Sequence, residues 1–183
     1  MATNWIHLAG NHERQVLTAP APGDDPADAF ARRCLGAPEK QWMASLPHCW
    51  PWIEDIYLCH GSPRRDNECL LETIEPGRPR LATAAEIDER LEPITASVVL
   101  CGHSHVPRAA RGTQGALLVN PGSVGQPAWD DELPFHHAVE NGSPDARYAI
   151  VERRAARWRV ELIALPYDHR AMAELALRNG AAD

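Results

Sequence analysis

Short apolar runs that end beside glycine, histidine and asparagine recur along the chain. The runs cover residues 5–9, 56–59 and 97–101, and their length and bounding turn residues predict buried strands. They end at Gly10-Asn11-His12-Glu13, His60-Gly61 and Gly102-His103-Ser104-His105, respectively. Open α/β sheets bind ligands at the carboxyl ends of their strands. We therefore expect these polar side chains to meet at one edge of a sheet.

The rest of the pattern predicts further strands mixed with helices. Helices are expected where apolar residues follow proline or a capping residue and stop before glycine or proline, over 30–35, 38–46, 83–91 and 168–179. Antiparallel hairpins are expected over 48–60, 108–120 and 147–165. Residues 126–144 are polar and interrupted by proline, which predicts a loop. Neither a repeat nor a linker divides residues 1–183, so one α/β domain is predicted.

Composition narrows the class of protein. The 183 residues carry a net charge of −7 and are 44% hydrophobic, as in a globular domain that needs no disulfide or structural metal to fold. The excess of acidic over basic residues would repel the phosphate backbone of a nucleic acid, so general nucleic-acid binding is not expected. No apolar stretch approaches the roughly 20 residues that a membrane span needs, and no secretory signal is recognisable. Five scattered cysteines without a CxxC pair favour a reducing compartment, and we expect a cytoplasmic location.

The closely spaced histidines suggest metal chemistry. His103 and His105 are two residues apart, so in extended backbone they would project to one side, about 7 Å apart at their Cα atoms. That separation suits two neighbouring metal ions. Asn120 precedes Pro-Gly-Ser and could either contact a phosphate or fix the turn after its strand.

In their order along the chain, these motifs resemble the calcineurin-like metallophosphoesterase superfamily and, more narrowly, its prokaryotic phosphodiesterase-like branch. GNHE, HG and GHSH follow one another as in that family, and the closing strand, Pro-Tyr-Asp and helix extend the resemblance over nearly the whole chain. The resemblance implies a four-layer αββα sandwich of two mixed sheets. It also implies a small phosphate-ester substrate.

The same resemblance implies a role for each site residue. Asn11, His60 and His103 would hold one metal ion, His105 a second, and His12 would act as general acid on the leaving group. Amide oxygen and imidazole ligands suit manganese, iron or zinc. Arg64, close behind His60, is predicted to clamp the substrate through its guanidinium group.

The chain departs from the family in one respect. The family begins with DxH and GDxxD motifs on two N-terminal βα units, and neither motif precedes Gly10. Residues 23–28, Gly-Asp-Asp-Pro-Ala-Asp, imitate GDxxD with one residue too many, and they follow GNHE instead of preceding it. The four predicted ligands are neutral, so two divalent ions would leave about four uncompensated positive charges. A gene model that starts too late, a second chain that supplies the missing half, or a degenerate sequence would each explain the missing motifs. The family binds two metal ions, and we expect two, one or none in this chain.

Two functions therefore remain open. The first is a metal-dependent phosphoesterase that hydrolyses phosphate mono- or diesters with a metal-activated water. The alternative is a catalytically impaired module that binds a metal or a partner. Because the family's first strands are not found, a sheet edge should be exposed, and exposed edges recruit partners. We therefore expect self-association.

Overall fold

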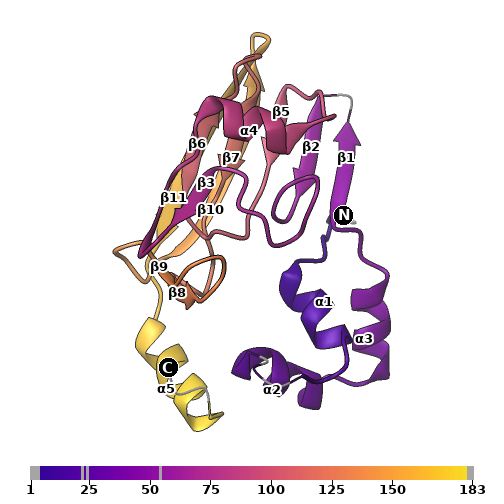
Figure 1. Ribbon diagram of the computed structural model, residues 1–183, viewed down its shortest axis with the longest axis vertical. Helices are drawn as coiled ribbons and strands as arrows, with labels where there is room; N and C mark the ends of the chain where they lie inside the picture. Colours follow the sequence, from indigo (N-terminus) through magenta and orange to yellow (C-terminus); the bar gives the residue numbers. More distant parts are fainter. Residues whose placement is uncertain (1–4, 22, 24, 54, 181–183) are drawn as a thin grey trace.

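A computed structural model describes residues 5–180 except 22, 24 and 54, and a mixed five-stranded sheet lies at its centre (Figure 1). The sheet order is β1-β2-β5-β7-β6, with bounds β1 Cys49–Ile53, β2 Ile56–Cys59, β5 Val98–Leu100, β7 Leu117–Asn120 and β6 Arg108–Arg111. β2, β5 and β7 run parallel, while β1 and β6 pair antiparallel at the edges. The hairpins predicted over 48–60 and 108–120 are confirmed.

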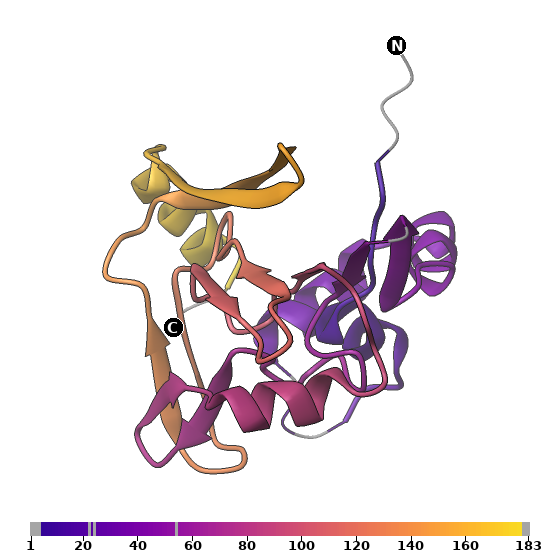
Figure 2. The ribbon, with the colours of Figure 1, turned by 90° about the horizontal axis from the view of Figure 1, so that it is seen from above.

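Different layers cover the two faces of this sheet. On one face, Ile87 and Leu91 of α4 (Ala84–Leu91) join a core cluster with Leu118. On the other face lies the hairpin of β10 (Ala146–Arg154) and β11 (Arg157–Leu165), whose Val160 packs against a core that includes Val98. Figure 2 shows α4 and the hairpin on opposite sides. The structure thus confirms the mixed α/β class with helices on a mixed central sheet, while the second β layer is a two-stranded antiparallel hairpin rather than the predicted second mixed sheet.

Three short helices precede the sheet and form a group beside β1 (Figure 1). They are α1 (Asn11–Leu17), α2 (Pro26–Cys34) and α3 (Ala37–Ala44). The last two confirm the helices predicted over 30–35 and 38–46. α2 begins earlier than predicted because the carboxylate of Asp25 accepts hydrogen bonds from the backbone N–H groups of Ala27 and Asp28.

The strand predicted over residues 5–9 is wrong. These residues form no strand, and the N–H of Ala9 instead donates a hydrogen bond to the carbonyl of Pro47. An apolar run becomes a strand only if a neighbouring strand pairs with it. Two of the three motif-bearing runs, at β2 and β5, therefore share a sheet, and the third leads directly into α1.

The loop predicted over 126–144 is also wrong. It contains the antiparallel hairpin of β8 (Ala128–Asp131) and β9 (His137–Glu140). Buried positions alternate along β9, but one of them is the polar His137, which hides the strand pattern in the sequence. A further hairpin, β3 (Glu72–Glu75) with β4 (Arg78–Leu81), was not predicted.

The C-terminal part follows the prediction. The hairpin over 147–165 is β10–β11, and the following helix is α5 (His169–Arg178), which is capped by the side chain of Asp168 and followed by Gly180. α5 has no buried residue. Among the described residues, no helix is long and apolar enough to cross a membrane.

Candidate metal centre

Asn11, His60 and His103 meet at the carboxyl ends of β2 and β5. The Asn11 Oδ1 atom lies 3.0 Å from Nε2 of His60 and 3.2 Å from Nδ1 of His103. His60 directly follows β2, His103 follows β5, and Asn11 is the first residue of α1. The parallel pairing of β2 with β5 brings the two histidines side by side, with ring centroids 5.6 Å apart.

A glycine allows α1 to approach this close. A Cβ atom on Gly10 would lie 2.7–2.8 Å from three atoms of the His60 ring. Gly10 also caps α1 and donates its N–H to Oε2 of Glu13 at 2.6 Å. The glycine of the GNHE motif is therefore explained by contact with the histidine of the HG motif.

The two histidines of GHSH lie on a tight turn rather than on extended backbone. Their φ angles are 57° for His103 and 60° for His105, so the geometry assumed from their spacing is wrong. Positive φ is costly for residues other than glycine and tends to occur at functional sites. Here the turn is held by surrounding polar side chains.

Three side chains hold the GHSH turn. The buried amide of Asn120 donates to the carbonyl of Gly102 and to the hydroxyl of Ser104. Trp129 of β8 donates from its indole to the Ser104 carbonyl, and Asn141 donates to the carbonyl of His105. Asn120 therefore fixes the turn. Trp129 and Asn141 escaped the sequence analysis because they belong to the segment read as a loop.

His105 contacts Gln126 and Trp129, and its charge also acts on the nearby His60 and His103. Its Nδ1 atom is 3.0 Å from the carbonyl oxygen of Gln126, and its ring centroid is 6.4 Å from that of Trp129. No hydrogen bond or ring contact from His105 to Asn11, His60 or His103 is seen among the described residues. The Gln126 contact leaves Nε2 as the ring nitrogen available to a ligand.

The site favours neutral imidazoles. Burial lowers the pKa of His60 and of His105. Burial, followed by the neighbouring His60 and His105, lowers the pKa of His103 to about 4. The nearby Glu13 and Asp66 act in the opposite direction on the pKa of His60. Neutral imidazole is the form that binds metal, so these residues are ready for a cation at neutral pH.

His12 makes a contact that the sequence did not reveal. Its Nδ1 atom lies 2.8 Å from Oδ1 of Asp28, a residue of α2 that is 4% exposed. With its amide turned to satisfy its neighbours, Gln15 donates to the other Asp28 oxygen at 3.1 Å. Burial raises the pKa of Asp28, and the bond to His12 opposes that rise. Asp28 is the last residue of the segment that imitates GDxxD, and residue 24 of that segment is outside the described part.

Arg64 is engaged in ion pairs. Its guanidinium donates to Glu68 at 2.8 and 3.1 Å and to Glu89 at 3.2 Å. A substrate would have to compete with both carboxylates, so the role of Arg64 as a clamp stays a prediction. A second arginine, Arg14 of α1, donates two hydrogen bonds to Asp66, which lowers the pKa of that carboxyl.

Two separations at the convergence point are compatible with a shared metal ion. Ligands that share an ion at about 2.1 Å lie about 3.0 to 3.4 Å from one another. The two separations from Asn11 Oδ1, 3.0 and 3.2 Å, fall in this range. One of the three donors is the amide oxygen of Asn11. In the described part of the chain no three His, Cys, Asp or Glu side chains form a metal-holding group.

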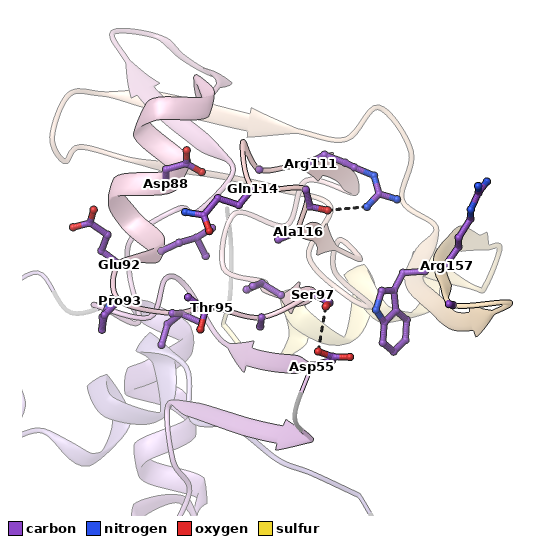
Figure 3. Close-up of a pocket in the computed structure, with 18 of the residues that line it drawn as sticks. Asp55, Asp88, Glu92, Pro93, Thr95, Ser97, Arg111, Gln114, Ala116 and Arg157 are labelled. Atoms are coloured by element: carbon purple, nitrogen blue, oxygen red, sulfur yellow. Dashed lines mark hydrogen bonds between the residues drawn. The ribbon is translucent and has the colours of Figure 1, made fainter.

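A sizeable pocket lies elsewhere in the described part of the chain. It measures about 970 Å³ and is lined by residues that precede the parallel strands, such as Asp55 and Ser97, and by Arg111 and Arg157 (Figure 3). Ser97 donates to Asp55, and Arg111 donates to the carbonyl of Gly115. This pocket contains none of the motif residues, so the candidate metal centre rests on its donor atoms and not on this cavity.

Comparison with known proteins gives three findings. Residues 6–140 match the model of the calcineurin-like phosphoesterase superfamily domain. A crystal structure of a metallophosphoesterase from Sphaerobacter thermophilus is similar with a TM-score of 0.71 and 22% identity, over 96% of this chain and 72% of that one. A hypothetical protein, PH1004 from Pyrococcus horikoshii OT3, has a TM-score of 0.62 and 15% identity, over 100% and 71% of the two chains. The search of curated proteins gives no match.

Proposed function

Because the chain belongs to the calcineurin-like phosphoesterase superfamily, we propose that it is a metal-dependent phosphoesterase that hydrolyses small phosphate mono- or diesters. The observation that carries this proposal is the convergence of Asn11, His60 and His103. Their three donor atoms come from motifs far apart in the sequence, and the two separations from Asn11 Oδ1 are compatible with ligands that share an ion.

Asn11, His60 and His103 would hold the first ion, and His105 would contribute to a second. Amide and imidazole donors suit manganese, iron or zinc. When bound, such ions polarise phosphoryl oxygens and make water a stronger nucleophile at neutral pH. The turn that carries His103 and His105 is fixed before a ligand arrives, so little ordering is needed at this point.

His12 can handle the leaving group's proton. The contact of Nδ1 with Asp28 fixes the orientation of the ring and leaves Nε2 free. A proton held at Nε2 could be donated to the departing ester oxygen. The His12 side chain is 45% exposed, so a small substrate can reach it.

A second candidate function is a metal- or partner-binding module without turnover. It is favoured by the donor set, since Asn11, His60, His103 and His105 are all neutral ligands. Carboxylates lie nearby, but Glu13 is bonded to the N–H of Gly10 and Asp66 to Arg14. On this reading the first ion binds and no hydrolysis follows.

Turnover of an activated phosphodiester at increasing manganese concentration separates the two. The phosphoesterase predicts metal-dependent hydrolysis that His60→Ala abolishes, while His136→Ala, a change at an exposed histidine beside β9, leaves it intact. Manganese binding without hydrolysis would favour the module. Hydrolysis that persists in His60→Ala would contradict both assignments of this site.

A further inference from the structure

The outer edge of β11 has no pairing partner. β10 and β11 form a two-stranded ladder joined by the turn Ala155-Ala156, in which both residues have positive φ. In a hairpin with a two-residue turn, the flanking residues form a hydrogen-bonded pair, and bonded residues alternate from there. The odd-numbered residues of β11 therefore bond to β10, and Trp158, Val160 and Leu162 direct their N–H and C=O groups outward.

These outward groups are unpaired within the described part of the chain. Among those residues, no backbone hydrogen bond reaches Trp158, Val160 or Leu162 from outside the hairpin. The edge of β10 differs, because the N–H of Arg147 donates to the carbonyl of Ser123 at 3.0 Å. Of the two edges of this ladder, β11 is thus the one open to another strand, and the hairpin lies on the outside of the molecule (Figure 2).

The charges along β11 select one kind of partner. Arg159 and Glu161 lie two residues apart, on the face of the strand opposite to Val160. In the described part of the chain neither is in an ion pair, and Glu152, which faces Arg159 across the ladder, is paired with Arg154 at 2.9 Å. An antiparallel strand with the same order of charges would complement this one.

We propose that β11 pairs antiparallel with β11 of a second copy of this chain, with the twofold axis at Val160. In that register Val160 faces its counterpart, Trp158 faces Leu162, and Arg159 of each copy faces Glu161 of the other. The result is a continuous four-stranded antiparallel sheet, ordered β10-β11-β11-β10. The pairing is independent of the proposed hydrolysis.

Neighbouring registers are disfavoured by charge. Moving the axis to Glu161 places the two Glu161 side chains opposite each other, and moving it to Arg159 does the same for the two arginines. Like charges directly opposite each other in a ladder are destabilising, whereas opposite charges contribute favourably. Charge therefore favours the register with its axis at Val160 over the two nearest registers.

Apolar side chains flank the same hairpin. Tyr148, Ile150 and Leu165 belong to its two strands and are 43%, 44% and 55% exposed. Tyr148 and Ile150 lie on β10, away from the proposed seam. At the seam itself Leu162, which is 40% exposed, would gain Trp158 of the other copy as an apolar neighbour. Burial between the neighbouring side chains of the two copies adds to the ladder's hydrogen bonds.

The mass of the full chain in solution tests the proposal. Sedimentation velocity across the micromolar range should show the 20.2 kDa monomer passing to twice that mass as concentration rises. Val160→Pro removes an N–H that points away from β10, so the hairpin should persist while the dimer is lost. A monomer at all concentrations, or a Val160→Pro variant that still dimerises, would overturn the proposal.

Charge exchange gives a second test that does not depend on proline. Arg159→Glu alone and Glu161→Arg alone should each be monomeric, because each places like charges opposite each other in its own dimer. An equimolar mixture should regain the doubled mass, because the two acidic side chains of the first variant then face the two basic side chains of the second. Arg78→Glu on β4, with circular dichroism to verify folding, is the matched control and should dimerise normally. A mixture that stays monomeric, or a control that also loses dimerisation, would refute the β11 interface.

Discussion

The Asn11 Oδ1 atom lies 3.0 Å from Nε2 of His60, although 49 residues separate the two positions. Such proximity requires that Gly10 lie against the His60 ring and that α1 begin where β2 ends. The pair sets the geometry of the candidate metal centre, and several expectations depend on it.

Gly10→Ala should weaken metal binding without removing a ligand. The added methyl group would meet the His60 ring at 2.7–2.8 Å, so the ring or α1 must move. Overpacking of this kind costs about 1–3 kcal/mol. Calorimetric titration with manganese should show a weaker site, and chemical denaturation should show reduced stability. Unchanged manganese affinity would show that His60 is not placed by this contact.

Asn11→Asp should strengthen binding of the first ion. The substitution keeps an oxygen at the same place and adds the negative charge that the neutral donor set lacks. Manganese affinity is expected to rise in this variant, whereas Asn11→Leu should lose on the order of 100-fold. Electron paramagnetic resonance of free manganese measures both. Equal affinity in the Leu variant would mean that the amide does not bind the ion.

Asp28→Asn should act on turnover through His12. The carboxylate orients the His12 ring, and losing its charge weakens that control without touching Asn11, His60 or His103. General acid help is worth about 10² to 10⁴ in rate, so His12→Asn should lose a factor in that range on esters with poor leaving groups. Asp28→Asn should lose less, and both should lose little when the leaving group needs no proton. Manganese affinity serves as the control, since it should stay the same.

Acid should destabilise the metal-free protein through His103. The pKa of His103 is about 4 in the folded chain, whereas a solvent-exposed histidine, as in the unfolded chain, has a pKa of 6.5. The unfolded chain therefore binds the proton more tightly. This contribution is fully present above pH 6.5 and is lost as the pH falls toward 4, by about 3 kcal/mol. His103→Asn, which tolerates the positive φ, should flatten the pH dependence of the free energy of unfolding between those values. The same slope in both proteins would contradict the burial of a neutral imidazole here.

The elements predicted well from sequence are those defined by local signals. The capping box of Thr83 and Glu86 marks α4, and the closely spaced strands of β10–β11 lie either side of a short turn. The prediction errors arise where contacts with residues distant in the sequence decide the local structure. Residues 5–9 are apolar but find no strand to pair with, and buried His137 conceals β9 behind a polar residue.

The same division applies to the site. Asn11, His60 and His103 were predicted because each belongs to a motif, and the structure brings them together. Asp28 and Trp129 were not, because nothing in their local sequence shows that α2 reaches His12 or that β8 reaches Ser104. The contacts that orient the donor residues come from tertiary packing.

The most direct test of the central claim is a manganese titration of four proteins, followed by electron paramagnetic resonance. The wild-type chain should show one saturable tight site, as should His136→Ala, whose exposed histidine lies beside β9. Asn11→Leu and His60→Ala should lose that site while keeping the wild-type circular dichroism spectrum. The account is contradicted if the wild-type chain binds no manganese, or if all four proteins bind it equally well.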